Sequence, residues 1–364
     1  MSLYIGIVGL PNVGKSTLFN ALTKTKAAQA ANYPFCTIDP NVGVVEVPDP
    51  RMAKLSEIVN PEKAIPAVVE FVDIAGLVKG ASQGEGLGNK FLSHIRQCDA
   101  IAQVVRHFKD DDITHVHDSV HPERDREIIE SELLLADLQT VENRMKKSAG
   151  EARSGDKAKK LYHELLERIK PQMESGVLVC QLELSDDEKI LLRDLHLITM
   201  KPLMYIVNMD EGEVGTADVE LLRKELGASD QNKIIPISAK VESELIDFDE
   251  EEAGEFLAEL GLKETGLNRL INDAYDLLGL QTYFTAGVKE VRAWTVKQGA
   301  TAPEAAGVIH TDFQAGFIRA EVTAYDDFIE CGGEAGAKEK GKLRLEGKEY
   351  IVQDGDVMHF RFSN

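Results

Sequence analysis

The sequence lacks long apolar runs and has few cysteines. No stretch approaches the ~18 uninterrupted apolar residues that a membrane-spanning helix needs. The start, Met1–Gly6, has no basic leader and is predicted to run directly into a first strand. The 4 cysteines lie apart, so neither a zinc-binding pair nor a disulfide framework is indicated. These absences predict a cytoplasmic protein, because thiols stay reduced there.

Basic residues are also scarce, with 41 Lys and Arg against 62 Asp and Glu and a formal net charge of −21 in 364 residues. This balance argues against wrapping nucleic acid over the whole surface, and we expect neither a DNA nor a membrane partner. One segment, 144–170, has the opposite balance. Its basic residues are Arg144, Lys146, Lys147, Arg153, Lys157, Lys159, Lys160, Arg168 and Lys170.

Short β-rich runs alternate with helical segments in residues 1–127 and again in 200–278. Near-continuous apolar strands between helices are typical of a mostly parallel sheet covered on both faces, with ligands at the carboxyl ends of the strands. We therefore predict one α/β domain that is split in the sequence. The runs are Tyr4–Val8, Gly43–Val47, Val68–Val72, Ala100–Val105, Leu203–Val207 and Lys233–Ile237.

Residues 128–199 interrupt this alternation. Two runs repeat apolar residues at three- and four-residue steps, and Gly150 and Gly155 lie between them. Such a pattern predicts two amphipathic helices in an antiparallel hairpin, a coiled-coil insertion in the α/β domain. The apolar positions are Leu134, Leu138, Val141 and Met145 in the first run, and Leu161, Leu165, Ile169 and Met173 in the second.

The last segment, 279–364, changes character again. We predict a strand over Val288–Val296, a short helix over Thr301–His310 capped by Thr301, and two closing strands within Ile351–Phe362. A β-rich unit of this length can fold alone.

The motif from Gly9 to Thr17 follows the first strand and precedes the helical run Ser16–Lys24. It fits the P-loop pattern, in which glycines let backbone N–H groups surround phosphates, the lysine reaches the β- and γ-phosphate oxygens, and the serine hydroxyl binds Mg²⁺. The sequence therefore predicts a P-loop nucleotide hydrolase with a GTPase-like fold. The expected phosphate-binding residues are Asn12, Val13, Gly14, Lys15, Ser16 and Thr17.

Two further positions complete the expected phosphate site. Asp73 opens an Asp-x-x-Gly motif at a strand end, where its carboxylate binds Mg²⁺ through water and Gly76 approaches the γ-phosphate. Thr37 lies in the preceding loop, where a switch threonine joins Ser16 as a Mg²⁺ ligand when the γ-phosphate is present.

The base of the nucleotide is expected to meet the loops after the predicted strands Leu203–Val207 and Lys233–Ile237. A guanine reader carries Asn-Lys-x-Asp, but here Met209 replaces the lysine and Glu211 the aspartate. Guanine specificity should therefore be damaged. The expected base-site residues are Asn208, Met209, Glu211, Ser238 and Ala239.

The order of these motifs resembles that of the Obg-like ATPases of the YchF family, over the whole chain. The tail is similar to a TGS domain, a ubiquitin-like β-grasp unit. The resemblance implies ATP hydrolysed to ADP and phosphate, Met209 and its neighbours meeting adenine through backbone groups, and binding to ribosomes, either the large subunit or a 70S-type particle. The matching stretches are Gly9–Thr17, Asn32–Asp39, Asp73–Lys79, Gly84–Gly88 and Asn208–Glu211.

Leu77 stands where many GTPases carry a glutamine that orients the attacking water. Two residues are candidates for the missing function. Asn12 could help bind K⁺ against the phosphates, or simply stabilise its loop. His115 matches a histidine thought to act in hydrolysis in the similar family; without that likeness, an ordinary surface histidine is the better interpretation. The predicted catalytic residues are Lys15, Asp73, Gly76 and His115.

Three functions remain open at this point. The first is an ATPase switch on ribosomes. The second is a GTPase with relaxed base specificity, in which Asp210 reads the base, acting in ribosome assembly or stress response. A small-molecule kinase is the third, but the later motifs give it no support.

Local RNA contact is expected at the hairpin and at a second basic set, although charge alone favours ordinary solvated surfaces. That second set is Lys338, Lys340, Lys342, Arg344 and Lys348.

Overall fold

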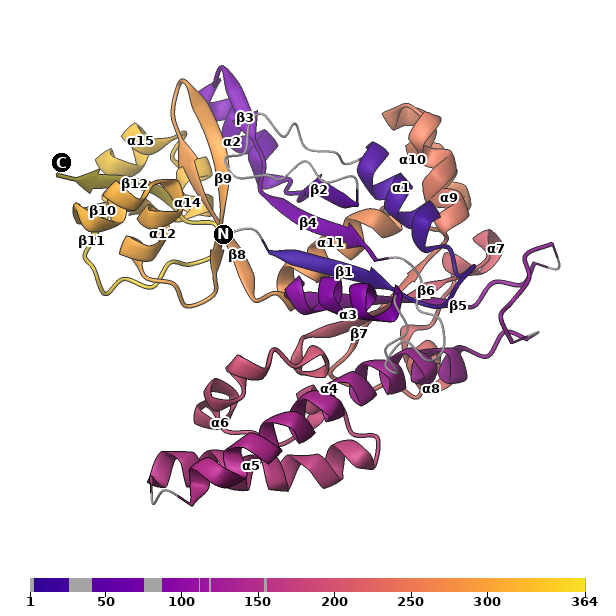
Figure 1. The fold of residues 1–364 in the computed structure, drawn as a ribbon. Helices are drawn as coiled ribbons and strands as arrows, with labels where there is room; N and C mark the ends of the chain where they lie inside the picture. Colours follow the sequence, from indigo (N-terminus) through magenta and orange to yellow (C-terminus); the bar gives the residue numbers. More distant parts are fainter. Residues whose placement is uncertain are drawn as a thin grey trace.

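The computed structural model describes residues 3–25, 41–74, 87–110, 112–117, 119–153 and 156–363, without the side chains of 25, 87–90 and 250. Within these ranges no helix is both long and apolar enough to span a bilayer. The described chain forms two six-stranded sheets and a projecting pair of helices (Figure 1).

The first sheet confirms the predicted α/β fold. Its strand order is β2-β4-β1-β5-β6-β7, and all neighbours are parallel except β2 and β4. Parallel strands buried on both faces need helical cover. Helices α1 and α11 lie on one face, and α3, α4 and α8 on the other (Figure 1). The strands are β1 (Tyr4–Val8), β2 (Val42–Glu46), β4 (Val68–Asp73), β5 (Ala100–Arg106), β6 (Leu203–Asn208) and β7 (Lys233–Ile237).

The covering helices follow from the chain order. They are α1 (Lys15–Thr25), α3 (Leu87–Gln97), α7 (Glu211–Val214), α8 (Val219–Leu226), α9 (Ala239–Glu244), α10 (Glu250–Glu259) and α11 (Gly266–Leu277). Because α1, α7 and α9 each begin just after a strand of the sheet, their amino ends gather at its carboxyl edge. This edge is where a ligand of such a sheet binds.

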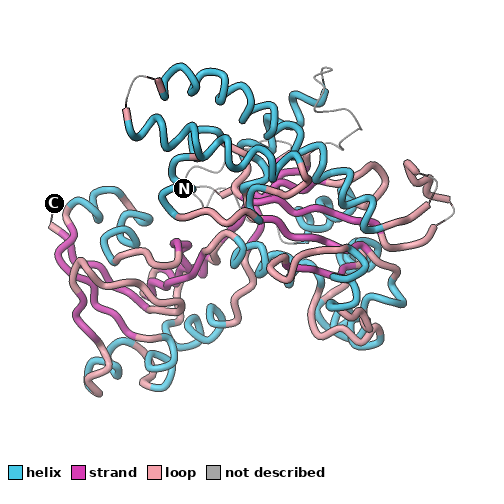
Figure 2. Tube along the Cα trace, turned by 90° about the horizontal axis from the view of Figure 1, so that it is seen from below, coloured by secondary structure: helices cyan, strands magenta, loops and turns pink. Residues whose placement is uncertain are grey.

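The projecting helices are α4 (Pro122–Ala152) and α5 (Lys157–Glu174), which run side by side in both views (Figures 1 and 2). Helix α4 is continuous from the face of β5 to the tip, so the arm grows out of the sheet domain without a hinge residue. The limits 128–199 for the insertion stay a prediction.

The seam between α4 and α5 buries most of the expected apolar residues, including Val141, Ile169 and Met173. The expectation for Leu161 is wrong: it is 51% exposed, and Tyr162 takes the buried position. The base of the arm is fixed by the buried carboxylate of Asp137, which accepts hydrogen bonds from the backbone N–H groups of Ile198 (2.8 Å) and Thr199 (2.7 Å). The short segments that return to β6 are η3 (Val179–Gln181), α6 (Asp186–Leu191), η4 (Arg193–Leu195) and η5 (Ile198–Met200).

The second sheet has the order β11-β10-β12-β8-β9-β3. Five of its strands come from the last segment of the chain, and they pack on α12. This mixed sheet with one crossing helix is consistent with the β-grasp unit that the resemblance implied. Its strands are β8 (Leu280–Ala286), β9 (Glu290–Lys297), β10 (Phe317–Thr323), β11 (Arg344–Glu346), β12 (Val357–Phe362) and β3 (Lys63–Ile65).

Local predictions for this segment were partly right. Thr301 caps α12 (Ala302–Ile309) through a capping box with Glu304, as expected. The strand predicted from Val288 begins only at Glu290, because the preceding residues form the turn from β8. The expected pair of closing strands is one strand, β12; Ile351 makes only an isolated bridge to Thr301. The remaining helices are α13 (Thr311–Ala315), α14 (Tyr325–Glu330) and α15 (Glu334–Glu339).

Strand β3 was not predicted in this sheet. It lies between β2 and β4 in the chain, together with α2 (Arg51–Val59), yet it pairs in parallel with β9. Arg51 reinforces the junction: its guanidinium binds Asp49 at 2.8 Å and Asp354 at 2.7 Å, and it lies 5.0 Å from the Phe284 ring centroid. An excursion from the first sheet therefore completes the second.

Candidate nucleotide-binding site

The P-loop lies between β1 and α1, at the carboxyl edge of the first sheet. Gly14 has φ +96°, and a Cβ there would lie 2.2 Å from the side-chain nitrogen of Asn208. Both the backbone conformation and the close approach therefore require glycine. Asn12 also adopts a left-handed conformation, with φ 62°, which asparagine tolerates better than most residues.

Lys15 is buried, with 7% of its surface exposed, and its amine donates a hydrogen bond to the Leu10 carbonyl at 2.7 Å. Burial lowers the pKa of this amine to about 8, while the charge of Asp73 acts in the opposite direction. The lysine therefore lies folded back within its own loop, close to Asp73 of the Asp-x-x-Gly motif.

Ser16 and Asp73 come together although 57 positions separate them in the chain. The serine hydroxyl donates to the Asp73 carboxylate at 3.5 Å. Burial raises the pKa of Asp73, and the nearby Lys15 charge opposes that shift. A hydroxyl beside a carboxylate is a donor set that suits Mg²⁺, which prefers oxygen ligands. The other expected phosphate-site residues, Thr37 and Gly76, lie outside the described residues, as does Leu77.

Asn208 joins three of the predicted motifs. Its amide nitrogen donates to the Val13 carbonyl at 3.0 Å, and its amide oxygen accepts from the Ala239 backbone N–H at 2.9 Å. The side chain is buried, so both bonds are shielded from water. One asparagine thus fixes the P-loop against the loops after β6 and β7.

A cavity of about 700 Å³ lies at this edge of the sheet. Its size is that of a typical small-molecule site. Met209 is buried in its wall, and the Ser238 hydroxyl, which also lines it, has no hydrogen-bond partner among the described residues. The cavity contacts the predicted residues Asn12, Gly14, Thr17, Asn208, Met209, Glu211, Ser238 and Ala239.

The two carboxylates after Met209 are both engaged. Glu211 forms an ion pair of 2.8 Å with Lys240 at the exposed mouth of the cavity. Asp210 accepts a hydrogen bond of 3.3 Å from the backbone N–H of Lys109. Each of these contacts engages one oxygen of its carboxylate in this conformation.

The loop after β5 forms a wall of the cavity that sequence reasoning missed. Phe108, Asp110 and Ile113 line the cavity, and none of them belongs to a recognised motif. Their position directly after a strand of a parallel sheet was the available signal. The amide nitrogen of Asn12 donates to the Thr114 carbonyl at 3.1 Å, so this loop touches the P-loop.

His115 follows this contact and is only 6% exposed, so its interpretation as an ordinary surface histidine is wrong. Its Nδ1 accepts from the backbone N–H of His117 at 3.1 Å, which leaves Nε2 to donate to the Asp125 carboxylate at 2.8 Å. Both ring nitrogens are thus engaged here. A role in hydrolysis stays a prediction and would require the imidazole to exchange one of these partners.

Comparison with known proteins decides the family. The chain is 56% identical to "Ribosome-binding ATPase YchF" of Bacillus subtilis, and the match covers 100% of both chains. This chain belongs to the YchF family. A YchF protein of Escherichia coli O157:H7 with the same description is 55% identical, again over 100% of both chains.

Solved structures and family models agree with membership in the YchF family. The structure of the Schizosaccharomyces pombe YchF GTPase matches with a TM-score of 0.89 and 40% identity, over 99% of this chain and 98% of that one. Residues 4–142 match the family described as "50S ribosome-binding GTPase". Residues 280–363 match the YchF GTPase C-terminal family, described as "Protein of unknown function (DUF933)".

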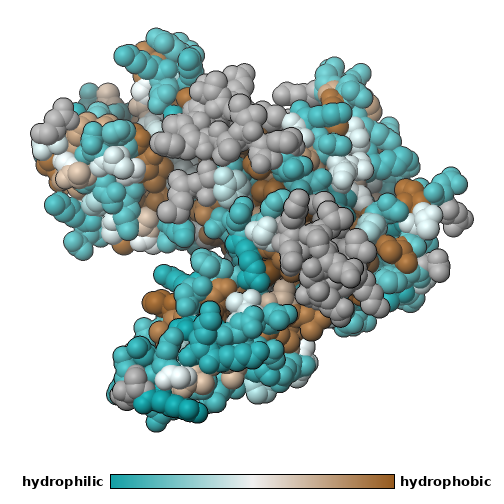
Figure 3. All heavy atoms as spheres, in the orientation of Figure 1, coloured by the Kyte–Doolittle hydropathy of each residue, from teal (hydrophilic) through white to brown (hydrophobic). Residues whose placement is uncertain are grey.

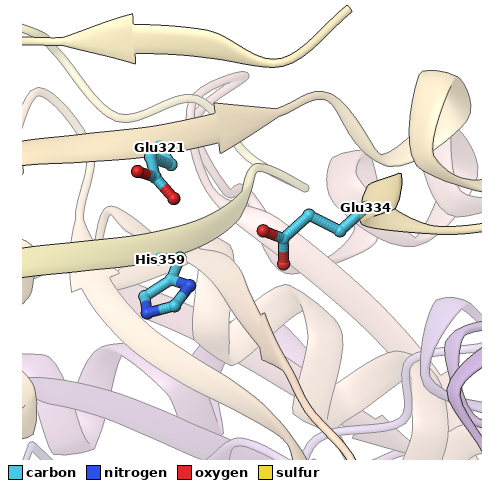
Figure 4. Close-up of side chains that lie close together, drawn as sticks. All are labelled: Glu321, Glu334 and His359. Carbon is cyan, nitrogen blue, oxygen red and sulfur yellow. The ribbon is translucent and has the colours of Figure 1, made fainter. Parts of the chain in front are cut away.

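A second group of possible metal ligands lies in the second sheet of this YchF-family chain. Glu321, Glu334 and His359 point toward one another from β10, α15 and β12, with ligand atoms within 4.8 Å (Figure 4). Both carboxylate oxygens of Glu321 are already bound by Arg361, at 3.2 and 3.0 Å, and Arg319 lies 3.6 Å away. These two guanidinium groups balance the two carboxylates, so the group has no excess negative charge to attract a cation.

Proposed function

We propose that this chain is a Mg²⁺-dependent ATPase that hydrolyses ATP to ADP and phosphate and binds ribosomes as a regulatory switch. The base end of the cavity carries this proposal. A guanine reader needs a carboxylate held toward N1–H and N2–H₂, whereas Glu211 is held by Lys240 through one oxygen and Asp210 by the Lys109 backbone through one oxygen. Met209, buried in the wall, offers adenine an apolar surface, while its backbone N–H donates to the Ile237 carbonyl at 2.8 Å.

The names of the relatives support ATP, since the bacterial proteins are described as ATPases. The Schizosaccharomyces pombe structure is described as a GTPase, which keeps a GTPase of relaxed specificity as the second candidate. Calorimetric titration of ATP and GTP with Mg²⁺ separates the two. We expect ATP to bind several-fold more tightly, because each lost bidentate contact to a base edge is worth roughly 1–3 kcal/mol by analogy with groove readout. Equal or tighter GTP binding would refute the ATPase proposal.

The phosphate end supplies the chemistry. Ser16 and Thr37 would hold Mg²⁺, with Asp73 acting through water, and the ion would neutralise charge on the transferring phosphate. Lys15 already donates to the Leu10 carbonyl, and its ammonium group has two further N–H groups with which to reach the phosphates. A triphosphate then adds anionic partners to this buried amine. Their charge favours its protonated form, which stabilises the transferring group.

The arm formed by α4 and α5 is the proposed ribosome contact. It projects from the body and is largely hydrophilic in the view of Figure 3. Arg144 is held by Glu151 at 3.2 Å, but most of the basic side chains near the tip are exposed. Lys160 forms an exposed ion pair with Glu164 at 3.7 Å, and RNA phosphates would meet accessible cations there. The exposed residues are Lys146, Lys147, Arg153, Lys157, Lys159 and Lys160.

The second basic set, in the carboxyl-terminal unit, is more neutralised. Lys342 pairs with Asp327 at 2.9 Å, and Arg344 lies 3.5 Å from Asp356. We therefore propose the arm as the main RNA contact and the carboxyl-terminal unit as a second surface against the ribosome. A protein with this partner would act in the cytoplasm.

Co-sedimentation with ribosomes and separated subunits tests this contact. Changing Lys157, Lys159 and Lys160 to Glu should weaken pelleting strongly and reduce its salt dependence, because fewer counterions are released. The control variant changes three exposed lysines of the first sheet's domain by the same total charge; these are Lys24, Lys224 and Lys263. If both variants pellet equally well, or equally poorly, the arm is not the contact.

A further inference from the structure

Arg106 is a fully buried arginine at the end of β5, with 2% of its surface exposed. No carboxylate lies within 4.0 Å of its guanidinium among the described residues. Burying a guanidinium without an anionic partner is unfavourable for stability. Departures from such rules concentrate at functional sites, and this one borders the nucleotide cavity.

The guanidinium binds three carbonyl groups of the next loop. Nε donates to the Phe108 carbonyl at 3.2 Å, while the two terminal nitrogens donate to Ile113 at 2.9 Å and Asp110 at 3.0 Å. Its central carbon also lies 4.3 Å from the centroid of the Phe108 ring. A planar fork with five N–H groups can reach three carbonyls at once, which an ammonium group on a flexible stem cannot do in the same geometry.

The same three residues, Phe108, Asp110 and Ile113, form the cavity wall beside Met209. Among the described residues, the other hydrogen bonds from this loop to the rest of the protein lie near its two ends. The Lys109 backbone N–H donates to Asp210 at 3.3 Å. The Asn208 carbonyl accepts from the backbone N–H of Phe108 at 3.0 Å, and Asn12 binds Thr114 beyond the other end. Arg106 is thus the side chain that fixes the middle of the loop.

We propose that Arg106 is a positioning residue that shapes the wall of the cavity facing the base, and so sets the part of the nucleotide affinity that comes from the base. This inference rests on the proposed nucleotide site. The phosphates are expected at Gly14–Thr17, and none of the carbonyl groups that Arg106 binds belongs to that segment. Loss of Arg106 should therefore weaken base binding while phosphate binding persists.

The experiment compares ATP with inorganic tripolyphosphate, which offers the phosphate chain without a base, each titrated with Mg²⁺. In Arg106→Gln, we expect ATP affinity to fall about tenfold, because hydrogen bonds from a charged group are lost. Tripolyphosphate affinity should stay within about twofold of the wild-type value. Arg106→Lys should lie between Arg106→Gln and the wild type, and it carries the test if Arg106→Gln does not fold.

Arg126→Gln is the matched control. Arg126 is also buried, at 8% exposed, and its guanidinium donates to the Gly227 carbonyl at 2.9 Å, away from the cavity lining. It should lose stability in thermal unfolding but keep the wild-type ratio of ATP to tripolyphosphate affinity. An unchanged ratio in the Arg106 variants, or the same change in Arg126→Gln, overturns the proposal.

The outcome is separable from that of the proposed function. Wild-type preference for ATP or GTP decides the proposed function by itself. If GTP binds better, the same comparison is made with GTP against tripolyphosphate. The ratio between variant and wild type then still decides the role of Arg106.

Discussion

Replacing Asn208 with Ala should uncouple the P-loop from the base-binding loops. The change removes two buried hydrogen bonds and leaves the Val13 carbonyl and the Ala239 N–H without their partner. A buried donor or acceptor left unsatisfied costs about 1–3 kcal/mol, so the free energy of unfolding should fall by about 2–6 kcal/mol. ATP binding should weaken as well, because both loops line the cavity.

Urea unfolding of the nucleotide-free protein and calorimetric ATP titration measure the two effects. Asn232→Ala is the control, since Asn232 donates one longer bond of 3.3 Å to the Leu203 carbonyl and does not line the cavity. It should lower stability by about 1 kcal/mol and leave ATP affinity unchanged. The reasoning fails if Asn208→Ala loses less than about 1 kcal/mol of stability, or binds ATP as the wild type does.

Three further outcomes are expected. Burial lowers the pKa of Lys15 from the ordinary lysine value of 10.5 to about 8 in the folded protein. Between these two pH values the unfolded chain binds more protons than the folded protein. The free energy of unfolding of the nucleotide-free protein should therefore rise by up to about 3 kcal/mol from pH 8 to pH 10.5. Lys15→Met, followed by chemical unfolding across that range, should lack this rise and should also lack ATPase activity. Hydrolysis should be faster in K⁺ than in Na⁺, and Asn12→Ala should abolish the difference; indifference of the wild type to the cation removes Asn12 from the mechanism. His115→Ala should lower kcat with little change in ATP affinity, whereas unchanged turnover would assign the His115–Asp125 contact to structure alone.

Local patterns in the sequence predicted the first sheet and the place of the P-loop between its first strand and the following helix. A strand followed by a glycine-rich turn and a helix leaves little freedom, so the positions of Lys15 and Ser16 follow from the motif. Asn208 could be placed for the same reason, since a parallel sheet brings the ends of its strands to one edge. The meeting of Ser16 and Asp73 is a direct result of that geometry.

What escaped prediction depends on contacts between distant segments. Phe108 and Ile113 carry no motif, and only the folded position of their loop makes them part of the cavity. The burial of His115 depends on Asp125 at the start of α4, which spacing alone could not reveal. Leu161 and Tyr162 are both apolar enough for the seam, so periodicity could not decide which of them faces α4.

The pairing of β3 with β9 has a consequence for the order in which the chain can fold during synthesis. Lys63 lies opposite Glu290 in the register, so the early strand must wait for more than half of the chain. At about 5–20 residues per second, this delay is on the order of 10–50 s. During that time β3 has no strand to pair with and α2 lacks its contacts with β9 and α14. The first sheet can form while α2 and β3 remain without these partners. The second sheet is completed only when the last part of the protein has been synthesised.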